Sequence, residues 1–207
     1  MKKLLCTFII LAISLLTASE AAAEFRYGPI VGGNVSTLRF KQDNIWKARS
    51  SFGATAGVMG ELMFPGIGFG IDIGLQYDMR GAKLNIGDFP MWADDYSSNE
   101  MVRLHYINLP LHLRYKYTNM NGFEDYLAPF AYAGPSIGFL AGHSKVDCID
   151  YAAGELGIDF GIGVELMRHW QVSFNYNWGL TYALKAKILT NYSARNSTFG
   201  IRVSYLF

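Results

Sequence analysis

The chain has 207 residues, of which 51% are hydrophobic and 15% aromatic, and its formal net charge is +1. This balance leaves no basic excess, so we expect no nucleic-acid partner. Only one of the two cysteines lies beyond the N-terminal segment, which excludes an internal disulfide framework. The length fits one domain.

The N-terminal segment has the pattern of a secretory signal peptide. A basic start, Lys2-Lys3, precedes an apolar run and an Ala21-Ala22-Ala23 cleavage site. The run has about 14 residues, whereas a transmembrane anchor needs roughly 20. We therefore expect residues 1–23 to be removed on export and residues 24–207 to form one outer membrane β-barrel domain. Cleavage would leave 16 basic and 16 acidic residues, from totals of 18 and 17.

Apolar and polar residues alternate in repeated segments along the rest of the chain. This period of two predicts strands with one apolar face and one mostly polar face. No continuous apolar stretch approaches the roughly 18 residues of a transmembrane helix. We expect eight strands, at residues 26–38, 51–64, 67–82, 101–117, 127–140, 153–167, 170–182 and 197–207.

The connections between these strands alternate in length, as in outer membrane barrels, which have short periplasmic turns and long external loops. Lipid offers the backbone no hydrogen-bond partner, so the sheet must close. We predict an all-β fold, an eight-stranded antiparallel up-and-down transmembrane β-barrel in the cell outer membrane. The long connections lie near 39–50, 83–100, 141–152 and 183–196, and the shorter ones near 64–67, 118–126 and 167–169.

A soluble, lipocalin-like eight-stranded barrel is the alternative fold, with the apolar face inside and the polar face in water. The polar face of this chain is dominated by Gly, Ser, Asn and isolated charges. A solvated surface would carry far more Lys and Glu. Small residues instead suit a narrow lumen that side chains must fill, which favours the membrane barrel.

Four prolines lie inside the predicted strands, where proline cannot donate a hydrogen bond to its neighbour. Because a closed barrel has no free edge, we infer β-bulges, at 106–110 and 133–136, where the alternation also slips. The prolines are Pro29, Pro110, Pro129 and Pro135.

Three strand segments, 27–38, 106–115 and 129–136, together resemble the PorT-like outer membrane β-barrel domain family. The middle segment reads Tyr-Ile-Asn-Leu-Pro-Leu, where the family typically has Tyr-Leu-Glu-Ile-Pro-Leu, so Asn108 replaces the usual acid. The resemblance covers the whole chain after residue 23. It implies an eight-stranded barrel in the outer membrane of Bacteroidetes-type Gram-negative bacteria. It implies no common activity, although some relatives take part in secretion systems.

Ionisable residues recur on the polar strand faces, which we expect to line the lumen. They form either an acid–base centre, with His112 and Asp72 facing each other, or an ion-pair network that fills the barrel. We favour the network, because buried charges must be paired and an eight-stranded lumen has little room for substrate. The candidates are Glu61, Asp72, Asp78, Arg80, His112, Arg114, Lys116, Glu155, Asp159, Glu165 and Arg202.

The long connections hold weaker candidates. Asp94-Asp95 and Glu100 offer oxygens to a cation but match no calcium-loop spacing, so we expect a solvated acidic loop. Trp46 and Trp92 are either contact anchors or residues that pack at the rim or in the lipid interface. Cys148 is either a reactive thiol, one half of an intermolecular bridge or an inert thiol, and we expect the inert thiol. Zinc spacings, phosphate loops and nucleophile elbows are absent, so we predict no catalytic residue, cofactor or metal.

Together these patterns predict a small non-enzymatic outer membrane β-barrel protein whose long external loops contact an unknown partner or which supports the cell envelope. The alternatives are a membrane-embedded enzyme using lumen or rim residues, and a narrow channel or secretion-system accessory barrel. The expected partners are outer membrane lipid, an unidentified extracellular ligand and, during biogenesis, the barrel assembly machinery. That machinery would recognise the apolar face of the last strand, Phe199, Ile201, Val203, Tyr205 and Phe207.

Overall fold

The computed structural model describes residues 24–40, 47–64, 66–85, 99–118, 122–144, 149–182, 184–186 and 193–207. The proposed signal peptide lies outside these residues. No helix in the described ranges is long and apolar enough to cross a membrane. The eight long strands are β1 (Glu24–Phe40), β2 (Lys47–Met63), β3 (Phe69–Asn85), β4 (Asn99–Lys116), β5 (Leu127–His143), β7 (Gly154–Leu166), β8 (Trp170–Gly179) and β10 (Ser193–Tyr205).

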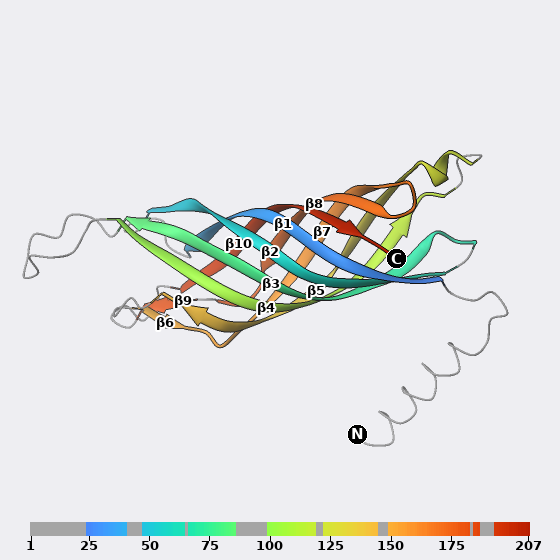
Figure 1. Ribbon diagram of the computed structural model, residues 1–207. Helices are drawn as coiled ribbons and strands as arrows, with labels where there is room; N and C mark the ends of the chain where they lie inside the picture. Colours follow the sequence, from blue (N-terminus) through green and yellow to red (C-terminus); the bar gives the residue numbers. More distant parts are fainter. Residues whose placement is uncertain are drawn as a thin grey trace, which may run out of the picture.

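Each long strand pairs antiparallel with its neighbours in chain order, and β1 also pairs with β10 (Figure 1). The closing seam runs from Ile30↔Ser204 to Phe40↔Ala194. This confirms the predicted closed, eight-stranded antiparallel barrel. Because all eight strands have two neighbours, their backbone groups are paired without help from lipid.

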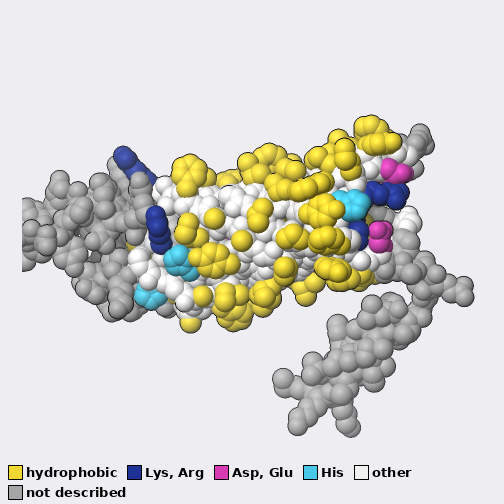
Figure 2. Space-filling view, viewed as in Figure 1, with side chains coloured by type: hydrophobic (Ala, Val, Ile, Leu, Met, Phe, Trp, Pro, Cys, Tyr) yellow, Lys and Arg dark blue, Asp and Glu magenta, His cyan; other side chains and the backbone are white. Residues whose placement is uncertain are grey.

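The two faces of the wall have opposite chemistry. Phe52 is 85% exposed and Leu113 is 59% exposed on the outside, whereas Glu61 and Asp159 are 0% exposed on the inside. On the face shown in Figure 2, hydrophobic side chains recur along the wall, and the charged side chains lie near its two ends. This is the reverse of a soluble barrel, so the lipocalin-like alternative is wrong.

The two ends of the barrel differ. The short turns 64–68, 117–126 and 167–169 lie at the same end as both Glu24 and the C-terminus. There the Phe207 N–H donates to the Tyr27 carbonyl at 2.9 Å, which fixes the last residue to β1. By the usual arrangement of outer membrane barrels, this turn end faces the periplasm and the loop end faces outward.

The structure adds three short elements within the connections. β6 (Ile149–Tyr151) and β9 (Leu184–Ala186) lie in segments expected to be loops. β9 pairs with β10, and β6 pairs with β9, so they extend the wall at the loop end. The third element, a 3-10 helix at Phe123–Asp125, lies in the turn before β5. Strands of three residues are too short for periodicity to reveal them.

The expected bulges are only partly present. The β4–β5 register shifts between His105 and Tyr106, which leaves Ala141 as the extra residue at the edge of the predicted 106–110 segment. The predicted bulge at 133–136 is wrong, because the β5–β7 register continues unbroken from Leu127↔Leu166 to Phe139↔Gly154. The β4–β5 register is also the same on either side of Pro135. The proline thus costs local ladder hydrogen bonds without adding a residue.

The β1–β10 seam can be tested by a disulfide across it. Ser36 and Thr198 are register partners with buried side chains. Opposite residues of antiparallel strands have Cα atoms about 4.5–5.5 Å apart, within disulfide range. We expect Ser36→Cys with Thr198→Cys, in a Cys148→Ser background, to give a reducible mobility shift on gels of boiled protein. The pair Ser36→Cys with Ser204→Cys should stay unlinked, and equal linkage of both pairs would contradict the register.

Candidate functional site

The lumen collects the ionisable residues of the polar strand faces. All eleven candidates are between 0% and 5% exposed. A twelfth, Arg26, has a side chain that is 11% exposed and joins the same network. Arg26 has an even position number, like the inward-facing Ile30, Asn34 and Ser36 of the same strand. The alternation of this first strand is too weak for the sequence to have indicated it.

The first of two charge clusters, the turn-end cluster, surrounds Glu61. This carboxylate lies 2.6 Å from the Lys116 Nζ and 3.0 Å from an Arg114 nitrogen, and it also contacts Arg26. Glu165 lies 2.7 Å from both Arg26 and Lys116. The Gln171 amide donates to both carboxylates at 2.7 Å, so one neutral side chain ties them together.

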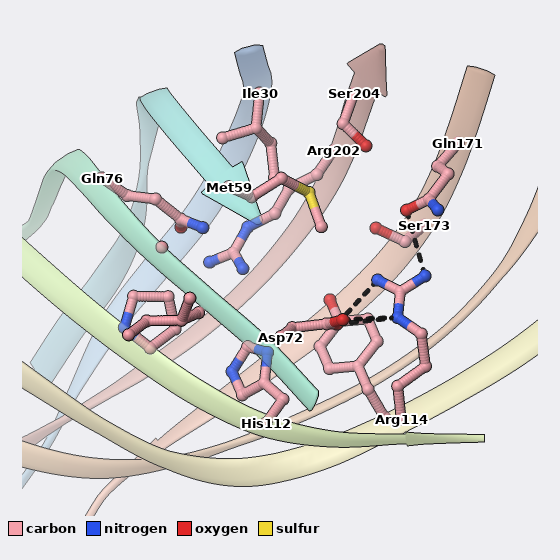
Figure 3. Close-up of a pocket in the computed structure, with 14 residues that line it drawn as sticks. Ile30, Met59, Asp72, Gln76, His112, Arg114, Gln171, Ser173, Arg202 and Ser204 are labelled. Atoms are coloured by element: carbon pink, nitrogen blue, oxygen red, sulfur yellow. Dashed lines mark hydrogen bonds and ion pairs between the residues drawn. The ribbon is translucent and has the colours of Figure 1, made fainter. Parts of the chain in front are cut away.

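Arg114 extends this cluster towards the middle of the lumen. Its Nε and Nη2 lie 2.8 and 2.7 Å from the Asp72 carboxylate, and its Nη1 donates to the Gln171 side-chain oxygen at 3.0 Å (Figure 3). The cluster thus contains the three acids Glu61, Asp72 and Glu165 and the three bases Arg26, Arg114 and Lys116. Buried charges need such pairing, because each unpaired ion costs several kcal/mol of desolvation.

Aromatic rings hold the Arg114 guanidinium in place. It lies 4.1 Å from the Phe130 ring centroid and 5.8 Å from that of Tyr132. The register partners of these two rings on β7 are Gly163 and Gly161. A Cβ on Gly161 would meet the Tyr132 ring at 2.2 Å, and one on Gly163 would meet the Phe130 ring at 2.6 Å. Glycine is therefore required on β7 to seat the rings that support the cation.

The loop-end cluster surrounds Arg80 and Asp159. Arg80 lies 2.9 Å from Asp78 and 3.5 Å from Glu155. Asp159 accepts hydrogen bonds from Asn177 and, at 3.4 Å, from Ser136. These contacts join β3, β5, β7 and β8 across the outer half of the barrel.

Between the clusters a cavity of about 20 Å³ remains, lined in part by Gln76, His112, Arg114 and Arg202 (Figure 3). A space of this size holds about one water molecule. Beside it Ile30, Met59 and Leu206 form an apolar cluster. The side chains described in the lumen therefore fill it instead of bordering an open path.

His112 and Asp72, which were expected to face each other, are paired in the strand register, but their side chains have other partners. The two are register partners across β3 and β4. The His112 Nε2 instead lies 3.2 Å from Asp159, and Asp72 pairs with Arg114. Each side chain has found a different partner across the lumen, so they form no acid–base dyad.

The remaining candidates are those of the long connections. Among the side chains that the structure describes, no group of three or more His, Cys, Asp or Glu is arranged to hold a metal ion. Glu100 lies at the start of β4. The other loop candidates, Trp46, Trp92, Asp94, Asp95 and Cys148, lie outside the described residues.

The last strand presents its apolar face outward. Phe199, Ile201 and Phe207 are 61%, 51% and 66% exposed, and Val203 and Tyr205 are half-buried. Tyr205 packs against Trp170 and Phe207, with ring centroids 5.0 and 5.1 Å apart. Leu206, on the opposite face, is 0% exposed.

The sequence matches a family model described as "Outer membrane protein beta-barrel domain" over residues 17–185. The match does not separate PorT-like members from others. Comparison with curated proteins finds no significant match.

Solved structures of outer membrane barrels are similar in fold. OprG from Pseudomonas aeruginosa has a TM-score of 0.51 at 12% identity, over 89% of this chain and 97% of that chain. Ail of Yersinia pestis, in complex with the heparin analogue sucrose octasulfate, has a TM-score of 0.46 at 12% identity, over 89% and 99%. Neisserial surface protein A has a TM-score of 0.42 at 12% identity, over 86% and 96%.

Removing Arg114 should unfold the barrel more easily, because Asp72 and Glu61 would lose a buried partner. We expect Arg114→Ala to lower the free energy of unfolding by about 3–5 kcal/mol, measured by urea titration in lipid. Arg168→Ala is the matched control. Its ion pair with Asp125 is solvent-exposed, with side chains 67% and 48% exposed, so its loss should cost at most about 1 kcal/mol.

Equal urea midpoints for the two variants would contradict a lumen held by desolvated pairs. The combined variant Asp72→Asn with Arg114→Leu should recover part of the loss, because it removes a charge together with its partner.

Proposed function

Because this chain belongs to the outer membrane protein β-barrel domain family, we propose that it is a small non-enzymatic barrel that presents its external loops to a partner or supports the envelope. The observation that carries this proposal is the filled lumen. Paired charges occupy both halves, and about 20 Å³ is left between them. Such an interior suits a rigid support better than a conduit or a substrate site.

Strands β1 to β4 are longer than a membrane crossing requires. β1 to β3 have 17 residues each and β4 has 18, whereas a membrane-spanning strand needs about 9–11. The connection between β3 and β4, residues 86–98, is thus attached to the ends of long paired strands. A partner outside the cell would meet these connections before the barrel.

Three finer assignments belong to the same proposal. We propose export with removal of residues 1–23, on the pattern of basic start, apolar run and A-x-A site. PorT-like membership rests on the three strand segments, including the one containing Pro110. Recognition by the barrel assembly machinery is proposed for the outward face of β10, which ends on the exposed aromatic Phe207.

A closed lumen should conduct no steady current. We expect the purified protein in planar bilayers to give no stable large conductance, because the described lumen side chains leave only about 20 Å³ between the two charge clusters. A stable wide-pore current would overturn the proposal in favour of a channel. A general porin reconstituted in the same bilayers provides the positive control.

The loops can be tested separately from the barrel. Replacing residues 86–98 with a short turn should leave folding unchanged, because β3 and β4 remain register partners from Phe69↔Tyr115 to Asn85↔Asn99. Cross-linking on intact cells should lose the adducts that the unaltered protein gives. The matched control shortens the β4–β5 turn at residues 119–121, at the opposite end. Adducts that survive the first change would argue against a loop-borne contact.

A further inference from the structure

Basic residues gather on the outer face of β2 and β4 at the loop end. Arg49 and Arg103 are exposed, and His105 is half-buried. Arg49 is the register partner of Lys83, Arg103 of Gly81 and His105 of Met79. These three partners are alternate positions of β3, and opposite residues of an antiparallel pair share a face. The register therefore places Arg49, Arg103 and His105 in one outward region, which we call the basic patch.

The basic patch lies at the margin of the apolar surface. His105 Nδ1 lies 2.6 Å from the Tyr77 hydroxyl, and their rings are stacked with centroids 5.9 Å apart. Ile107 and Leu75, further from the loops, are 44% and 50% exposed to the bilayer. Tyrosine marks the membrane–water interface. Arg103 lies two residues beyond His105, about 7 Å further along the strand, which is the depth of lipid headgroups.

Among the side chains that the structure describes, the two margins of the apolar surface differ in charge. At the turn end the exposed Arg168 is paired with Asp125, and Glu24 has a side chain that is 71% exposed. Figure 2 shows acidic and basic side chains together at that end, and Lys, Arg and His side chains at the loop-end margin.

We propose that the basic patch binds the anionic, phosphate-bearing headgroup of an outer-leaflet lipid. Arginine guanidinium groups match phosphate oxygens with paired hydrogen bonds. The phosphate lies between Arg49 of β2 and Arg103 of β4, the strands on either side of β3.

Spin-labelled lipids test this directly. The folded protein is reconstituted in phosphatidylcholine, and the association of spin-labelled phosphatidylglycerol is measured relative to that of spin-labelled phosphatidylcholine. We expect the unaltered protein to select the anionic lipid, and high salt to weaken the selection. In Arg49→Gln with Arg103→Gln, selection should fall by up to about fivefold for each side chain lost, equivalent to about 1 kcal/mol.

Two control variants define the site. Arg168→Gln removes an exposed arginine at the other margin and should leave the selection unchanged. Arg49→Lys with Arg103→Lys keeps the charge and should retain most of it. Equal association of the two lipids with the unaltered protein, or an unchanged ratio in the double Gln variant, would overturn the proposal. Selection of spin-labelled stearate as strong as that of phosphatidylglycerol would overturn the assignment to phosphate.

Discussion

Lipid cannot accept or donate a hydrogen bond, and the architecture of this chain follows from that restriction. Every long strand must have two neighbours, so the seam between β1 and β10 has to close. Closure with eight strands leaves a narrow interior, which every second side chain must enter. The wall therefore determines both the apolar exterior and the content of the lumen.

Inside the wall, charge and volume have to be balanced together. Glu61 has three cationic neighbours, and Arg114 lies both against Asp72 and over the Phe130 ring. The rings in turn rest on glycines of β7, where any side chain would collide with them. Replacing a buried ion pair by apolar residues of similar volume is often neutral or stabilising, whereas removing one partner alone is costly, so these charges have to be kept or lost together.

Most of what the sequence could predict follows from the alternation of side chains between the two faces of each strand. A residue's face follows from its position alone, so the burial of Asp78 and Asp159 and the exposure of Phe199 and Ile201 were accessible without coordinates. The ion-pair partners were not, because they depend on how side chains of different strands meet across the lumen. His112 reaches Asp159 on β7 instead of its neighbour Asp72, a choice that no spacing encodes. The extra residue at Ala141 and the irregularity between Ser50 and Thr55 were hidden for a similar reason, since bulges depend on pairing.

The strands also differ in length around the circumference, from 18 residues in β4 to 10 in β8. Eight residues correspond to about 26 Å along a strand, and to somewhat less in height once the tilt of the strands is included. The turn-end pairs Leu127↔Leu166, Leu166↔Trp170 and Trp170↔Tyr205 are continuous, so the shortness of β7 and β8 falls at the loop end. The barrel thus has a high side and a low side, with β6 and β9 attached through β10 beside the low one. A neighbour diffusing in the membrane plane would meet long paired strands from one direction and short ones from the other, so the protein has a front and a back in its membrane.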